Sequence, residues 1–195
     1  MAKSRTTWII IIVVVLIGLW LIRMYNSLVT ADENVSTAWS QVENVYQRRL
    51  DLIPNLVSTV QGAADFERNT LNEVIQARAA ASSVNLDASN LNEAGLAAFQ
   101  QAQDGLGQAL SRLMVVVERY PELKANQNFR DLQSQLEGTE NRIAVERNRF
   151  NEAVRTYNTF IRRFPKNVIA GIFGFDARAY FQAEENAQKA PQVQF

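Results

Sequence analysis

The feature that most constrains this chain is an uncharged apolar run near its N-terminus. From Trp8 to Ile22 the run has fifteen residues, of which twelve are isoleucine, valine or leucine. With its flanks, the span predicted at residues 7–28 is long enough as a helix to cross a hydrocarbon core about 30 Å thick. The aliphatic side chains favour insertion by roughly 4 to 7 kcal/mol in total. We therefore expect a transmembrane helix, with Trp8, Trp20 and Arg23 anchoring it at the membrane interfaces.

The flanking residues bear on processing and orientation. Lys3 and Arg5 precede the run as the charged segment of a signal peptide would, and Val29-Thr30-Ala31 is a weak cleavage site. The run is long for a signal peptide and Arg23 follows it, which favours an uncleaved anchor. Basic residues are slightly more numerous before the run than after it. This excess favours a cytoplasmic N-terminus and a body outside the cytoplasm.

The composition removes many functional classes. Twenty basic and twenty acidic residues cancel, so the chain lacks the basic excess that nucleic-acid binding requires. The absence of cysteine and histidine excludes disulfides, thiolate catalysis and imidazole-based catalysis or zinc binding. Carboxylate-only metal binding has no spacing in its favour. We therefore predict no catalytic residues, no cofactor, no metal and no nucleic-acid partner.

Beyond the apolar run, the hydrophobic residues recur at steps of three and four, which is typical of one face of a helix. Eight glycines and four prolines allow few turns, so the pattern predicts long helices over residues 23–79, 90–120 and 129–164. The predicted fold is all-α: an N-terminal transmembrane helix that continues into a long antiparallel three- or four-helix bundle. The count becomes four if the chain bends sharply at Pro54, although a helix that continues with a kink is favoured.

The junction between the span and the body has no sign of a flexible linker. Residues 23–50 contain neither proline nor glycine, whereas flexible linkers are rich in glycine and serine. We predict one unbroken helix from the membrane to at least Arg49. The predicted organisation is a short N-terminal segment (1–6), a transmembrane helix (7–28), a helical bundle (29–183) and a flexible C-terminal tail (184–195).

Five polar residues are candidates for interaction or for a structural polar role: Arg48, Arg49, Asp51, Glu140 and Arg147. The first three lie near Pro54 and could form a recognition patch of arginine forks, but an ion pair inside the bundle is favoured. Glu140 and Arg147 interrupt an apolar row, seven residues apart on one side of a helix. A polar layer that fixes helix register is favoured there over a proton acceptor.

The segment Val168–Phe175 is the only other strongly apolar stretch. It could dip into a membrane or a partner's groove. The favoured interpretation is a lid that folds back over the end of the bundle, because its two glycines allow a tight return.

Several stretches resemble the LemA family of bacterial membrane proteins. They are YNSLV (25–29), ENVSTAWSQVENVYQRRLDLIPNLV (33–57), AR (77–78), ERYPELKANQNFRDLQSQLEGTENRIAVERNRFNEAVRTYN (118–158) and FPKNVIAGIFGF (164–175). The resemblance covers most of the chain. It implies an all-α body tethered by one N-terminal span, at the bacterial inner (cytoplasmic) membrane. It implies no catalytic residues, because the family has no agreed activity.

The surface composition adds a hint of self-association. Arginine supplies 16 of the 20 basic residues, and asparagine and glutamine number 32; lysine is the basic residue usually depleted from interfaces. We expect a non-enzymatic, membrane-anchored scaffold whose partners are the bilayer, through residues 7–28, further copies of itself and other envelope proteins. One alternative is a carboxylate-dependent or metal-assisted hydrolase that uses Glu140 with Glu43 or Glu73. Another is an accessory subunit of a membrane protease or transporter.

Overall fold

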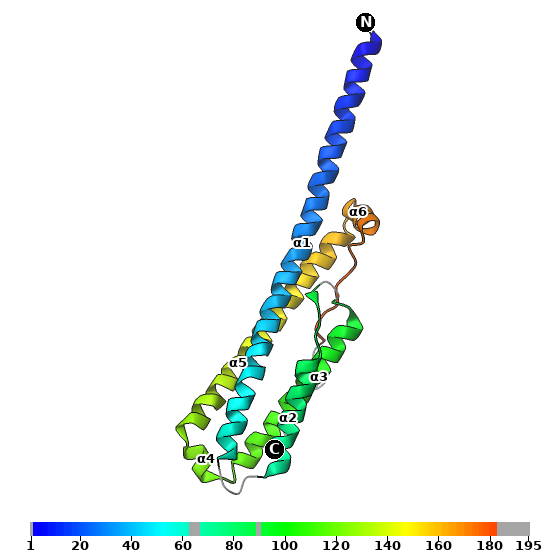
Figure 1. The fold of residues 1–195 in the computed structure, drawn as a ribbon. Helices are drawn as coiled ribbons and strands as arrows, with labels where there is room; N and C mark the ends of the chain where they lie inside the picture. The colour runs from blue at the N-terminus through cyan, green and yellow to red at the C-terminus, as the bar shows by residue number, and fades with distance from the viewer. Residues whose placement is uncertain (1, 63–66, 89–90, 183–195) are drawn as a thin grey trace, which may run out of the picture.

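The computed structural model describes residues 2–62, 67–88 and 91–182, and all regular structure within these ranges is helical (Figure 1). The helices are α1 (Ala2–Gln61), α2 (Arg68–Ser83), α3 (Glu93–Val117), α4 (Pro121–Ala125), α5 (Gln127–Arg162) and α6 (Lys166–Phe173). The predicted all-α fold with a long apolar N-terminal helix is therefore confirmed. The tail predicted at residues 184–195 lies outside the described residues.

Four long helices alternate in direction and form the body. The helix α5 lies along α1, and α2 lies along α3, while α1 also contacts α2 (Figure 1). The short helix α4 connects α3 to α5 at one end of the body. At the other end, α6 lies beside α1 where the latter leaves the body. The exposed N-terminal part of α1, residues 7–23, is called the stem below.

The helix α1 is unbroken from the stem into the body, which confirms the predicted continuity as far as Arg49, and it continues through Pro54. Proline has no N–H, so the carbonyl of Leu50, one turn earlier, loses its helical partner. The Nε of Arg78 on α2 donates to this carbonyl over 3.0 Å. A side chain from the neighbouring helix thus satisfies the acceptor that the proline leaves free.

The prediction of one helix up to residue 79 is wrong. The helix α1 ends at Gln61, and α2 begins at Arg68. Val60 and Val74 are both fully buried in the same cluster. The apolar stripe that reads as continuous in the sequence therefore folds back on itself, because its two halves bury their apolar faces together. The bundle has four long helices, and the chain reverses between residues 61 and 68 instead of at Pro54.

Two hydrophobic clusters fill the body, and each large side chain that is fully buried contributes roughly 1.5–3 kcal/mol. The upper cluster, on the stem side, comprises Met24, Leu28, Val35, Trp39, Val42, Tyr46, Leu86, Leu91, Leu96, Phe99, Ile143, Phe150, Val154, Tyr157, Ile161, Ile169, Ala170 and Phe181. The lower cluster comprises Leu50, Ile53, Leu56, Val57, Val60, Leu71, Val74, Ala81, Leu106, Ala109, Leu110, Leu113, Val117, Leu123, Phe129 and Leu136.

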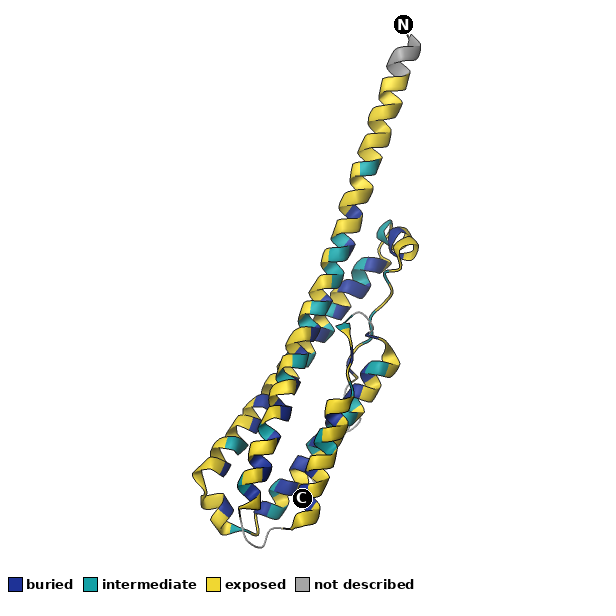
Figure 2. Ribbon diagram, viewed as in Figure 1, coloured by how far each residue is buried: buried dark blue, intermediate teal, exposed yellow. Residues whose placement is uncertain are grey.

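The stem projects beyond both clusters with its apolar side chains uncovered (Figure 2). Among the described helices, α1 is the one long and apolar enough to cross a membrane. Its most apolar stretch has a mean hydropathy of 2.5, with 6% of its residues buried. A core helix of a soluble protein would be mostly buried. An apolar helix without protein cover instead fits the hydrocarbon core of a bilayer.

The chain leaves α6 in an extended conformation. Gly174 ends the helix with a φ of 75°, a left-handed conformation that glycine adopts without steric cost. The N–H of Phe175 then donates to the carbonyl of Ala170 over 2.9 Å. Residues 175–182, called the strap below, run back along the body without regular structure.

Candidate functional site

A polar layer lies where the two clusters meet. It consists of Arg49 on α1, Gln103 and Gly107 on α3, and Thr139 and Glu140 on α5. Arg49, Gln103, Thr139 and Glu140 each fall between the last residue of one cluster and the first residue of the other on their helix, and Gly107 directly follows Leu106 of the lower cluster. The layer therefore separates the upper from the lower cluster across three helices.

The centre of the layer is an ion pair between α1 and α5. Arg49 is 5% exposed, and its Nη2 lies 3.4 Å from Oε2 of Glu140, whose side chain is 61% exposed. A Cβ at position 107 would stand 3.0 Å from the same Nη2, so the glycine leaves room for the guanidinium. The pair connects the buried guanidinium of an arginine on α1 to a carboxylate of α5 at the surface.

The other polar groups in and beside the layer are a hydroxyl, an amide and a phenol. The hydroxyl of Thr139 donates to the carbonyl of Gln135 over 2.7 Å. The Oε1 of Gln103 is buried with no hydrogen-bond partner. Burial raises the pKa of the adjacent Tyr46 to about 12, an effect that the charges of Arg147 and Arg49 partly oppose. Its phenol therefore stays protonated at neutral pH.

The structure separates the predicted polar residues into different environments. It brings Arg49 and Glu140 together, but Arg48 and Asp51 are exposed. Asp51 accepts a hydrogen bond of 2.7 Å from Nε2 of Gln47, one turn earlier on the same helix. The three residues near Pro54 thus do not share one site.

Arg147 lies two turns of α5 away from Glu140, and its side chain contacts the strap. Its Nη2 donates to the carbonyl of Gln182 over 3.1 Å, and its guanidinium lies 4.9 Å from the centre of the Phe181 ring. A cation over an aromatic face is attracted by the electrons of the ring. Arg147 therefore holds the end of the strap, not the ion pair of the polar layer.

The carboxylates of the alternative hydrolase hypothesis differ in their surroundings. Glu73 accepts from Nη1 of Arg112 over 3.1 Å, and Glu140 forms the ion pair with Arg49. Burial raises the pKa of Glu43, and the charge of Asp87 adds to this, while the indole of Trp39 lowers it. Within the described ranges, no three acidic side chains gather in a way that could hold a metal ion.

Two asparagines on α5 clamp the strap, a feature that the sequence analysis missed. Asn158 donates to the carbonyl of Arg178 and accepts from its N–H, both over 2.9 Å. Asn151 does the same for Phe181, at 3.2 and 2.9 Å. Seven helical residues rise about 10.5 Å, and three extended residues span about 10 Å. The spacing of the asparagines thus matches the strap residues that they hold.

Side chains of the strap complete its docking. The guanidinium of Arg178 donates to Oδ1 of Asp32 on α1, from Nη2 at 2.9 Å and from Nε at 3.2 Å. Phe181 is buried, and its ring centre lies 5.4 Å from that of Phe150 and 6.0 Å from that of Trp39. The sequence signal that could have revealed this docking is the pair Asn151 and Asn158. Both lie on the side of α5 that carries its apolar row.

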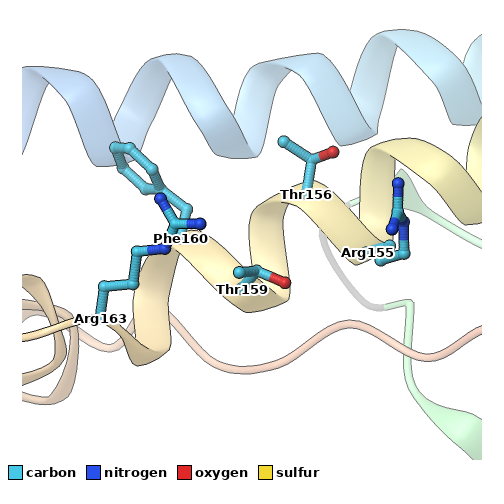
Figure 3. A pocket seen from close by; sticks show the side chains of 5 residues that line it. All are labelled: Arg155, Thr156, Thr159, Phe160 and Arg163. Atoms are coloured by element: carbon cyan, nitrogen blue, oxygen red, sulfur yellow. The ribbon is translucent and has the colours of Figure 1, made fainter.

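A shallow groove of about 230 Å³ lies at the upper end of α5 (Figure 3). It is lined by Arg155, Thr156, Thr159, Phe160 and Arg163. Arg155 forms an ion pair with Glu152, with its Nη2 2.6 Å from the carboxylate. This hydrogen bond lowers the pKa of Glu152. The lining comes from one helix and the residue that ends it, so the groove lacks the enclosure by several elements that small-molecule sites have.

The comparisons with known proteins identify relatives of this chain. The family model described as "LemA family" matches residues 38–195. Magnetosome protein MamQ 2 of Paramagnetospirillum magneticum is 31% identical over 179 residues, which cover 83% of this chain and 66% of that protein. Magnetosome protein MamQ of Magnetospirillum gryphiswaldense is 29% identical over 178 residues, covering 83% and 65%. Protein LemA of Metamycoplasma hominis is 24% identical over 160 residues, covering 82% and 69%.

The chain spans just under two thirds of the length of the magnetosome relatives it matches. The family match nevertheless includes the body from Ala38 onward, with the polar layer, α6 and the strap. The uncovered apolar stem and these relatives together support a membrane-associated helical protein. On this match, the chain belongs to the LemA family.

Proposed function

We propose that this LemA-family protein is a non-enzymatic, membrane-anchored scaffold that self-associates and presents its helical body to other proteins of the cell envelope. The observation that carries the proposal is the continuity of α1. One helix of 60 residues, about 90 Å long, supplies the stem and then a packed face of the body. The body therefore has a fixed geometry relative to the membrane, which favours regular packing of neighbouring copies.

The chemistry of the body supports a structural role. Two of its three candidate carboxylates, Glu140 and Glu73, each pair with an arginine of a neighbouring helix. The names of the matched relatives, magnetosome protein and Protein LemA, name no reaction. Extensive helical surfaces rich in arginine, asparagine and glutamine suit contacts between proteins.

The packing refines the proposed membrane placement. Met24 and Leu28 are buried in the upper cluster, so the body begins inside the span predicted at residues 7–28. We place the membrane-spanning part at residues 7–23, about 25 Å of helix, with a cytoplasmic N-terminus and the body outside the cytoplasm. The excess of basic residues before the run supports this orientation.

Self-association is tested by light scattering on the full-length protein, purified from native membranes in a mild detergent. We expect a particle that contains several copies. A monomer at high protein concentration would contradict self-association. Proteins that remain bound after crosslinking would identify the envelope partners, and the absence of any would contradict the presentation of the body to them.

The role of rigidity is tested by inserting two glycines between Arg23 and Met24. This point lies just above the first buried residue of the body, so the insertion frees the stem while the packed face stays intact. We expect a folded body and weaker assembly. A seven-residue helical insertion at the same point is the matched control, because it keeps the helix continuous and turns the body by only about 20°. Full assembly of the glycine variant would show that rigidity plays no part.

A further inference from the structure

The helix α6 and the residues before it carry a contiguous apolar surface. Phe164, Val168, Ile172 and Phe173 are between 52 and 83% exposed. Val168 and Ile172 are four residues apart in α6, which places them along one side of the helix, and Phe164 lies in the turn just before it. The other large apolar side chains exposed on the described body (Tyr25, Ile75, Val115, Val145 and Tyr180) lie on separate elements. Isolated exposed apolar residues are ordinary, whereas a contiguous patch marks an interaction surface.

The opposite side of α6 fixes the direction of this patch. Ile169 and Ala170 are buried in the upper cluster, so the helix covers the end of the body as the lid interpretation predicted. That packing leaves Val168 and Ile172 pointing away from the core. The helix therefore has two apolar sides, one packed in the body and one uncovered.

Contacts with α1 determine where the patch lies along the axis of the stem. The ring of Tyr25 lies 5.0 Å from that of Phe173 and 5.9 Å from that of Phe175. Tyr25 follows Ile22, the last residue of the uncharged run, by three residues, or about 4.5 Å along the helix. The headgroup layer of a bilayer adds about 5–7 Å beyond each side of the hydrocarbon core. A bilayer that covers the stem therefore has its headgroups at the level of α6, which lies beside α1 where the stem leaves the body (Figure 1).

The charges around the patch suit phospholipid headgroups. Residues 162–175 include Arg162, Arg163 and Lys166 and no acidic residue. The Nζ of Lys166 lies 3.3 Å from the centre of the Phe160 ring, at the edge of the groove that contains Arg163. Helices that lie in a membrane interface combine an apolar side with basic residues in this way.

We propose that α6 is a second membrane contact, which inserts Phe164, Val168 and Ile172 into the interface of the bilayer that α1 spans. The proposal rests on the membrane anchoring by α1 given above. The bilayer is the occupant that the structure favours, because the patch is continuous with the lipid-facing stem and carries basic flanks. Two contacts, a spanning helix and an interfacial one, restrict the tilt of the body as well as its height.

The experiment uses the absence of cysteine from the natural chain. Full-length I172C is labelled with a nitroxide and placed in vesicles of phosphatidylcholine and phosphatidylglycerol. Its collision rates are measured with oxygen, which concentrates in lipid, and with a water-soluble nickel chelate. V168C provides a second label on the same side. V115C is the matched control, because Val115 is as exposed as Ile172 but lies near the far end of α3. L16C reports on the stem itself.

We expect labels at 172 and 168 to collide preferentially with oxygen, as the label at 16 does, and the label at 115 to collide preferentially with the nickel chelate. A lipid profile at 16 with water-like profiles at 172 and 168 would overturn the proposal while leaving the anchor intact. A water-like profile at 16 would instead overturn the anchor. Spin–spin broadening at 172 that disappears on dilution with unlabelled protein would show a second copy on the patch, and this also overturns the proposal.

A change in height gives an independent test. A seven-residue helical insertion after Arg23 raises the body by about 10.5 Å and rotates it by only about 20°. We expect the label at 172 to change from a lipid-like to a water-like profile, while the label at 16 keeps its lipid-like profile. An unchanged profile at 172 would contradict the bilayer as the occupant.

Discussion

The upper and lower clusters of the body are built in different ways. The upper cluster centres on aromatic rings, and one of them, Phe181, comes from the strap, which has no regular structure. The lower cluster is formed by leucine, isoleucine, valine and alanine of the helices, with Phe129 as its one buried aromatic residue among those described. The lower cluster follows from helical periodicity. The upper cluster requires a distant segment to arrive at the correct place.

The contacts of Trp39 show how concentrated the upper cluster is. Its ring centre lies 5.3 Å from that of Phe99 and 5.5 Å from that of Phe150, both edge-on, and its Nε1 donates to the carbonyl of Leu86 over 3.1 Å. Such ring pairs contribute about 0.5–1.5 kcal/mol each beyond burial. The lower cluster has no such centre, since its burial is divided among many aliphatic side chains. The following predictions test this difference, from the largest expected effect to the smallest.

Replacing Trp39 by alanine removes the centre of the upper cluster. We expect a loss of about 3–5 kcal/mol in the free energy of unfolding, measured by urea unfolding in detergent, together with faster proteolysis of the strap. Phe129→Ala is the matched control in the lower cluster, where an equally buried ring is lost. It should destabilise the protein without exposing the strap. Equal proteolysis of the strap in both variants would contradict the separation of the clusters.

Replacing Asn158 by alanine tests the clamp on the strap. The variant leaves the N–H and the carbonyl of Arg178 without their present partner. We expect a cost of about 1–3 kcal/mol, with faster hydrogen exchange at the Arg178 amide. Thr156→Ala changes an exposed residue nearby on the same helix and should leave that exchange unaltered. Unchanged exchange in the Asn158 variant would show that the strap is held by Phe181 and the Arg178–Asp32 pair alone.

Alkaline pH should weaken the upper cluster selectively. Burial raises the pKa values of Tyr46 and Tyr157 to about 12, against about 10 in the unfolded chain. Between these values the folded protein holds more protons than the unfolded one, so stability falls as pH rises from 10 to 12 and these groups change nothing below pH 10. Urea unfolding across this range should show the decline. Tyr46→Phe should reduce the slope of the unfolding free energy against pH by up to one proton. An unchanged slope would contradict the raised pKa of Tyr46.

The ion pair at the boundary should have the smallest effect. Glu140 is mostly exposed, so Glu140→Gln should cost less than about 1 kcal/mol. Arg49→Met replaces the buried guanidinium by an apolar chain of similar length and should be close to neutral or stabilising. Urea unfolding measures both effects. A loss of several kcal/mol in either variant would show that the two clusters depend on the polar layer for their stability.

Some features of the site were predictable and others were not. The sequence singled out Arg49 near Pro54, where an ion pair inside the bundle is favoured, and Glu140 as a charge that interrupts an apolar row. The structure pairs these two residues with each other. It did not reveal that Arg147 would reach the strap, nor that Arg178 would pair with Asp32, 146 residues away. The extended strap has no helical periodicity in its sequence, and its contacts are determined only when the helices pack.

The sequence by itself determined the all-α class, the apolar stem and the unbroken helix between stem and body. Helical periodicity, length and the absence of proline and glycine are local properties, and each acts within a few turns of one segment. Tertiary structure alone decided that the stripe around Val60 and Val74 folds back, that Asn151 and Asn158 clamp the strap, and which side of α6 stays uncovered. These outcomes depend on burying apolar surface between segments distant in the chain, and no local pattern specifies which distant segments will meet.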